Sequence, residues 1–430
     1  MYARLTAFVA AGVFAAMFGS AGRVLAAAPP LADPQSVGFS PQRLQRLGSA
    51  MQNLVEKGER AGIVTVVSRD GHIVQLGEYG QRDVAGKKPM RADTIVRAYG
   101  MTEPVTAVAV MTLYEEGKLQ LDDPIVAYIP QLAGLQVLEK GANGKRIRLP
   151  TRQPITIRQL LTHTSGLSYT FPAGVSFKRD AVFAPTVTLA ELIPQIAKLP
   201  LVHQPGAGWT YGPSYEVLAR LVEVISQQPF DQFLEQRIFK PLSMNDTAFH
   251  VPPEKRDRFA EVYASSGEKG TLTVATKNAP HNGSFEAGAK FLSGSEGLVT
   301  TALDYWIFAQ MLANRGELDD TRILSPSTVS LMMQEQLPRD FGPPEFPGPS
   351  GTDSLIGHNF GLGFGVLSMP QRYGVAGSAG LVRRSGAANT TFWIDPESQV
   401  VAVFMSQYLP KSGSRIERDF QALVYQAIVK

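Results

Sequence analysis

Hydrophobic and polar positions along the chain follow a strand period near its start, a helical period in its middle and a strand period again near its end. Residues 63–68 and 72–79 are rich in β-branched side chains and are joined by Asp70-Gly71, a strong hairpin signal. Helical spacing then dominates, and strands return in LGFGVLSM, ANTTFWIDP and VVAVFMSQ. Further helices are predicted at the two ends and in the middle of the chain, over residues 41–56, 189–198, 215–226, 232–239 and 416–429. This order predicts an α+β fold, in which helices flank an antiparallel β-sheet and an all-helical lobe is inserted between its halves.

One stretch stands apart, the run AYGMTEPVTAVAVMTLYEEG. Its apolar residues recur at helical spacing from 101 to 116, Pro104 is tolerated in a first turn, and Gly117 ends the pattern. The start of such a helix presents free N–H groups and the positive end of the helix dipole. Gly100 and Glu103 lie at this start, so we expect the helix to carry chemistry.

The same stretch resembles the active-site helix of the serine β-lactamase superfamily, which includes class C β-lactamases, penicillin-binding proteins and family VIII esterases. There the helix opens with S-x-x-K, in which Ser is the nucleophile and Lys its activator. Gly100 and Glu103 occupy those two positions here. The resemblance covers residues 35–430 and implies the β-lactamase/transpeptidase-like fold. It implies a single domain over residues 29–430, with an α/β lobe of residues 29–130 and 285–430 and a helical lobe of residues 131–284.

Two further motifs of that family have counterparts. Tyr211 matches the Tyr of Y-x-N, although Pro213 replaces the Asn, and Arg384-Ser385-Gly386 aligns with the K-T-G strand, which also occurs as H-x-G or W-x-G. With an ordinary phenol pKa of about 10, Tyr211 is expected to donate a hydrogen bond, or else only to hold the junction of the lobes. Arg384 either binds substrate groups or pairs with Glu103. The segment LLTHTSGL, with His163 and Ser165, is expected to brace a packed turn.

Glu296 is the second unexpected acid. Family members resembling this chain read S-G-G-x-G-L-V-S-T in this region, whereas the chain reads SGSEGLVTT from residue 293. A large acid among small residues is either a solvated loop carboxylate or the partner of Glu103 on the opposite wall of one cleft. Asp304, Glu286 and His281 are weaker neighbours.

These substitutions exclude an acyl-serine at position 100, because glycine has no nucleophile. We expect the missing side chain of Gly100 to leave room for a water molecule, and Glu103, Glu296 and Tyr211 to be catalytic. Two carboxylates and a water are the equipment of an inverting glycoside hydrolase, with either acid as the base. Gly100, Arg384, Ser385 and Trp209 are expected to bind the substrate, a small molecule or an oligosaccharide such as a bacterial envelope glucan. The alternatives are a catalytically dead ligand-binding protein and a residual ester or amide hydrolase.

Composition limits the cofactors, binding partners and cellular locations that we expect for the protein. The chain has 430 residues, a formal net charge of +3 and no cysteine, so disulfides, thiolate chemistry and nucleic-acid binding are not expected. The six histidines show no ligand spacing, and neither a metal nor another cofactor is implied. Arg4, the apolar run 5–18 and the alanines 26–28 predict a signal peptide over residues 1–28 and a periplasmic or secreted protein. No membrane span is expected in the mature chain, and the oligomeric state cannot be read from the sequence.

Overall fold

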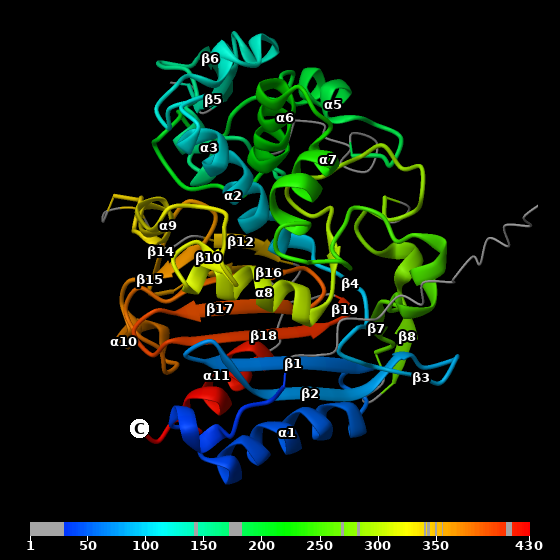
Figure 1. Ribbon diagram of the computed structural model, residues 1–430. Helices are drawn as coiled ribbons and strands as arrows, with labels where there is room; N and C mark the ends of the chain where they lie inside the picture. Colours follow the sequence, from blue (N-terminus) through cyan, green and yellow to red (C-terminus); the bar gives the residue numbers. More distant parts are fainter. Residues whose placement is uncertain are drawn as a thin grey trace, which may run out of the picture.

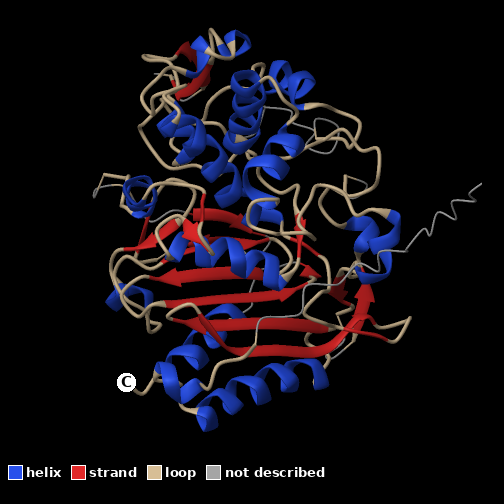
Figure 2. Ribbon diagram, viewed as in Figure 1, coloured by secondary structure: helices blue, strands red, loops and turns tan. Residues whose placement is uncertain are grey.

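In a computed structural model, helices of the protein pack against one large β-sheet. The model describes residues 30–141, 145–171, 183–267, 271–281, 284–338, 341, 345–348, 351–354, 356–409 and 415–430. The predicted signal peptide, residues 1–28, lies outside the described residues. Within them the main sheet has eight strands in the order β14-β15-β16-β17-β18-β1-β2-β3, and each neighbouring pair is antiparallel. The sheet therefore confirms the predicted α+β class (Figures 1 and 2).

The sheet joins the two ends of the chain. Strands β1 (Gly62–Arg69) and β2 (His72–Asp83) form the predicted hairpin, with Asp70 and Gly71 both at positive φ, as this tight turn requires. β1 also pairs with β18 (Val400–Ser406) from the C-terminal part. The other strands are β3 (Lys88–Pro89), β14 (His358–Phe360), β15 (Gly365–Leu367), β16 (Val382–Gly386) and β17 (Thr390–Asp395).

Apolar side chains cover both faces of the sheet, because helices pack against both. Val64 and Val66 of β1 belong to the larger core, whereas Ile63 and Val67 point to a second core on the other face. The second core contains α1 (Pro41–Glu56) and α11 (Ile416–Tyr425), which lie together below the sheet in Figure 1. The larger core contains α8 (Ala302–Ala313).

The segment 131–284, predicted as the helical lobe, holds α3 (Ile157–Leu161), α5 (Leu189–Ile196), α6 (Ser214–Ser226) and α7 (Phe230–Leu234). It also holds strands: β5 (Gln136–Lys140) pairs with β6 (Arg146–Pro150), and β7 (Tyr263–Ser265) with β8 (Leu272–Val274). The remaining short elements are α9 (Pro326–Met333), α10 (Pro370–Tyr373), β4 (Val96–Arg97), β9 (Val299–Thr300), β10 (Glu317–Leu318), β11 (Thr321–Arg322), β12 (Glu345–Gly348), β13 (Gly351–Ser354) and β19 (Tyr408–Leu409).

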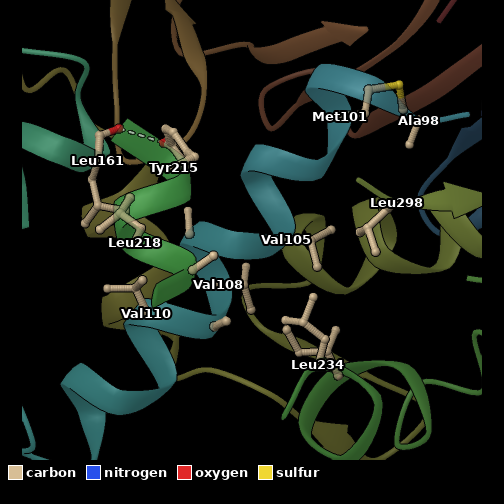
Figure 3. Packing of buried hydrophobic residues seen from close by; sticks show 14 of the residues in the cluster. Ala98, Met101, Val105, Val108, Val110, Leu161, Tyr215, Leu218, Leu234 and Leu298 are labelled. Carbon is tan, nitrogen blue, oxygen red and sulfur yellow. Dashed lines mark hydrogen bonds between the residues drawn. The ribbon is translucent and has the colours of Figure 1, made fainter. Parts of the chain in front are cut away.

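Helix α2 (Thr102–Glu115) connects the two parts of the molecule, and the short 3₁₀ helix η2 (Tyr99–Met101) precedes it. Every residue from 102 to 113 is buried, so the helix passes through the core rather than along a surface. Figure 3 shows Val105 and Val108 packed among side chains of neighbouring elements such as Leu218 and Leu234. A carboxylate in its first turn is therefore enclosed by protein. Among the described residues, no helix combines the length and apolar character needed to cross a bilayer.

Candidate functional site

Glu103 lies at the centre of a buried polar cluster. It occupies the first turn of α2 and its side chain has no exposed area. Arg384 of β16 donates a hydrogen bond to its Oε2 atom and forms an ion pair with it. The Nε2 atom of His163 lies 3.1 Å from the same oxygen. Of the two roles that the sequence left open for Arg384, substrate binding or pairing with Glu103, the structure shows the pairing.

Two atoms of this cluster keep unused hydrogen-bonding capacity. Oε1 of Glu103 and Nδ1 of His163 are buried, and neither makes a hydrogen bond within the described part of the chain. Buried polar atoms are rarely left this way. Burial lowers the pKa of His163 despite the opposing effect of Glu103, so the ring is neutral. Because a carboxylate only accepts, Nε2 carries the proton and Nδ1 is a second acceptor.

Aromatic rings surround His163. The centres of the Trp209, Tyr211 and Phe360 rings lie 5.4, 5.1 and 5.5 Å from its own. The guanidinium of Arg384 lies 5.4 Å from the centre of the Tyr211 ring, within cation–π range. Trp209 and Tyr211 are therefore part of the wall of the Glu103 cluster, and their roles in substrate binding and catalysis stay predictions.

Glu296 is held in a second polar group beside the first. Its Oε1 accepts a hydrogen bond of 3.4 Å from the Tyr211 hydroxyl, and its Oε2 lies 2.7 Å from Nε2 of His281. With 7% of its surface exposed, Glu296 is not a solvated loop carboxylate. Burial, followed by the charges of Glu103 and Glu296, raises the pKa of Tyr211 well above its ordinary value. Tyr211 is therefore a protonated donor that experiences both carboxylates.

The structure corrects the expectation at Gly100. A Cβ atom built on this residue would lie 2.6 Å from the carbonyl oxygen of Ser385. The water-sized space predicted beside Gly100 is therefore wrong on this side, because the backbone of β16 packs directly against η2. The residue before Gly100, Tyr99, has a φ of 47°, a conformation that costs energy for a large side chain.

Ser385 does not join the predicted substrate contacts through its side chain. Its hydroxyl lies 2.9 Å from Glu417 and 3.0 Å from Thr391. Successive side chains of a strand point to opposite faces, so the hydroxyl of Ser385 and the guanidinium of Arg384 lie on different sides of β16. The sequence pattern could not separate the two neighbours.

Two histidines contact the buried acids more directly than the sequence indicated. His163, expected only to brace a turn, contacts Glu103, and His281, a weak neighbour in sequence, contacts Glu296. The available signal for His163 was a polar residue within the buried motif LLTHTSGL. Among the described residues, no group of three or more His, Cys, Asp or Glu side chains is arranged to hold a metal ion.

The antiparallel sheet, the inserted lobe and the polar cluster at the start of the central buried helix define a protein of the β-lactamase/transpeptidase type. The chain belongs to the beta-lactamase family, whose model matches residues 47–427. The assignment of Gly100 and Glu103 to the serine and lysine positions of the family stays a prediction.

Similar proteins agree with this membership. Protein Rv1367c of Mycobacterium tuberculosis is 34% identical over 371 residues, which cover 84% of this chain and 89% of that protein. The lovastatin esterase of Penicillium rubens is 29% identical, and the match covers 88% of this chain and 98% of the esterase. Among solved structures, EstCE1, described as a hydrolase with promiscuous acyltransferase activity, has a TM-score of 0.74 at 24% identity and covers 91% of this chain and 99% of its own. Esterases and acyltransferases are thus relatives of this chain.

Proposed function

We propose that the protein is a hydrolase that works without an acyl-enzyme, and that it cleaves a glycosidic bond by direct attack of water. The observation that carries the proposal is the pair of buried carboxylates with unlike partners, whose charges both act on Tyr211. Glu103 is paired with a cation, Arg384, whereas Glu296 contacts a phenol and an imidazole. Two acids in different surroundings can take opposite roles in acid–base catalysis.

In this mechanism Glu103 is the base. Its Oε1 atom accepts a proton from water while the water oxygen forms a bond to the anomeric carbon. Glu296, in its protonated form, gives its proton to the glycosidic oxygen as the bond from that oxygen to the anomeric carbon breaks. The configuration at the anomeric carbon inverts, which in such enzymes requires roughly 6.5–9.5 Å between the carboxylates to admit the water. Tyr211 orients Glu296, and exchanged roles of the two acids would give the same products.

The hydrolase class and the glycosidic bond are supported by different observations. The relatives named as esterases and acyltransferases support a hydrolase of small molecules. The glycosidic bond rests on the carboxylate pair alone, since Gly100 offers no nucleophile for an ester mechanism of the acyl-serine kind. A periplasmic or secreted location, which we propose from residues 1–28, would give access to envelope glucans and oligosaccharides.

The test is release of reducing sugar from a panel of bacterial envelope glucans and oligosaccharides, with the anomer of the first product read by NMR. Wild type is compared with Glu103→Gln and Glu296→Gln. The matched control is Glu223→Gln in the last turn of α6, where Glu223 pairs with Arg220 rather than with a residue of the site. We expect an inverted product from wild type and from the control, and loss of turnover by at least about 10²-fold in either site variant. Cleavage of p-nitrophenyl esters but of no glycan would refute the glycosidic assignment.

A second candidate is a binding protein without turnover. It is favoured by one observation: Glu103 is completely enclosed, and both Arg384 and His163 hold the same oxygen. Such an arrangement also fits a catalytically inactive site, in which the charges of Glu103 and Arg384 neutralise each other. Calorimetric titration of wild type with the same glycans separates the two candidates, because binding without any product after long incubation would favour the binding protein.

A further inference from the structure

The turn that carries Glu296, residues 293–297, is fixed between two helices. On one side, the hydroxyl of Thr106 in α2 donates a hydrogen bond of 2.7 Å to the carbonyl oxygen of Gly294. On the other side, the turn lies so close to α6 that a Cβ atom on Gly294 would collide with the backbone of Tyr215. The position of Glu296 therefore depends on how this turn is held.

Glu216 of α6 provides the central contact. It is 1% exposed, its Oε1 accepts a 2.7 Å hydrogen bond from the Ser293 hydroxyl, and its Oε2 accepts one of the same length from the backbone N–H of Gly294. The Ser293 oxygen in turn accepts a 3.0 Å hydrogen bond from the backbone N–H of Glu296. A continuous chain of hydrogen bonds thus leads from Glu216 to Glu296.

We propose that Glu216 is a positioning residue, which clamps the turn 293–297 so that the Glu296 carboxylate faces Tyr211 and His281. Its effect on catalysis rests on the proposed function, whereas the clamp itself does not. An ionised carboxylate accepts from both donors at once. A protonated one must use one oxygen as a donor, so the Ser293 hydroxyl has to turn and the contact with Glu296 changes.

The protonation of this clamp changes near neutral pH. Burial raises the pKa of Glu216 to about 7, against the opposing effects of Ser293, His281, Gly294 and Ser295. His281 is the charged or titratable neighbour among these groups, and it also contacts Glu296. The proposal therefore implies a second hydrogen-bonding arrangement of the turn, beside the one that the structure shows, in the range where the site is expected to work.

The experiment is an NMR titration that needs no substrate. The backbone amide signals of Gly294 and Glu296 are followed from pH 5 to pH 9 in wild type, Glu216→Gln, Ser293→Ala and the control Glu223→Gln, after circular dichroism confirms folding. We expect both amides to titrate with a midpoint near 7 in wild type and in the control, and neither to do so in Glu216→Gln. In Ser293→Ala, Gly294 keeps the transition and Glu296 loses most of it.

An unchanged titration of Gly294 in Glu216→Gln would overturn the clamp. Because the readout is independent of turnover, the clamp can be established even if no glycan is cleaved, and the two failures are distinguishable. Where a glycan is cleaved, Glu216→Gln should remove the limb near pH 7 from the kcat profile with little change in KM, a result that mere loss of folded protein would not give.

A different observation, at the far end of the helical lobe, carries a second inference. The β5–β6 hairpin projects at the top of the molecule in Figure 1. All five residues of β6 are exposed, and Ile147 and Leu149 retain 45% and 37% of their accessible surface. Basic residues alternate with these apolar ones, and no acid occurs between residues 140 and 152, which contain Lys140, Lys145, Arg146, Arg148 and Arg152.

Residues 140–152 carry five basic side chains, of which Arg152 lies 3.9 Å from Glu139, in a chain whose formal net charge is +3. We infer that the β5–β6 hairpin docks on an anionic phospholipid surface. Charge complementarity selects the occupant. Arg146 and Arg148 lie on one face of β6 and Ile147 and Leu149 on the other, and all of them are exposed, so the hairpin meets the membrane edge-on. In this orientation the arginines reach lipid phosphates from one face, while the two apolar side chains enter the interface between headgroups and acyl chains from the other. A nucleic acid or a polar polysaccharide would use the charges and leave the two apolar side chains without a contact.

Vesicle sedimentation tests this inference. Phosphatidylcholine vesicles are compared with and without phosphatidylglycerol, using wild type, Arg146→Glu/Arg148→Glu, Ile147→Ser/Leu149→Ser and the control Lys57→Glu/Lys87→Glu at exposed sites elsewhere. We expect only wild type and the control to sediment, only with the anionic lipid, and less at high salt. Equal sedimentation of all four proteins, or none by wild type, would overturn the inference.

Discussion

Replacing Glu216 by Gln should change how the stability of the protein depends on pH. The pKa of Glu216 is raised from an ordinary 4.5 to about 7 in the folded protein, and burial is the main cause. The folded state therefore binds the proton more tightly than the unfolded state, so the free energy of unfolding falls as pH rises from about 4.5 to about 7. A difference of roughly 2.5 pKa units corresponds to about 3 kcal/mol.

Urea unfolding at pH 5 and pH 8 measures this effect for wild type, Glu216→Gln and Glu223→Gln. Other buried acids, such as Asp304 with a pKa raised by burial to about 6, contribute equally to all three proteins and cancel in the comparison. We expect wild type and the control to lose about 2.5 kcal/mol more than Glu216→Gln between the two pH values, because part of the effect falls below pH 5. Loss of hydrogen bonds in the variant lowers its stability at both pH values and does not affect the difference. Parallel pH dependence in all three proteins would refute the reasoning.

Three further substitutions test the site. Gly100→Ala should lower the free energy of unfolding by about 1–3 kcal/mol, because its Cβ meets a backbone oxygen that cannot move freely; unchanged urea stability would contradict the close packing. Arg384→Ala should cost about 3–5 kcal/mol by leaving a buried carboxylate unpaired, and adding Glu103→Gln should recover most of it; additive losses in this double-mutant cycle would exclude the coupling. Tyr211→Phe should cost about 1–3 kcal/mol in thermal unfolding, because Glu296 loses a donor; a stability equal to wild type would show that this hydrogen bond is not formed in solution.

The sheet and the central helix could be predicted because their signals are local. Alternating apolar positions and the Asp70-Gly71 turn are properties of adjacent residues, and helix α2 follows the predicted range 101–116 within one residue at each end. The family motifs added Tyr211 and Arg384, which the structure brings to Glu103. Each of these predictions rests on a short stretch of sequence and needs no knowledge of contacts between distant segments.

The environment of each acid could not be predicted, because it depends on contacts between distant segments. Glu296 contacts Tyr211, which lies 85 residues away in the sequence, and His281 because the folded chain brings these segments together. The space at Gly100 was misjudged for the same reason: a glycine in sequence can mean room for a ligand or close approach of another backbone, and the carbonyl of β16 makes it the latter. The role of Glu216 required knowing which backbone N–H groups its helix faces.

If the predicted alignment of Gly100 and Glu103 with the family's serine and lysine holds, the charge at position 103 has an electrostatic explanation. Arg384 is 4% exposed and Glu103 is fully enclosed, so a lysine at position 103 would place two cations together in the core with little solvent to separate them. A glutamate at the same position neutralises the guanidinium. Independently, β16 packs so closely against η2 that a Cβ atom at position 100 would collide with the carbonyl oxygen of Ser385. A serine side chain at position 100 would meet the same carbonyl oxygen, so we expect Gly100→Ser alone not to create an acyl-serine enzyme. On the predicted alignment, we therefore expect any activity of this site to depend on its buried carboxylates.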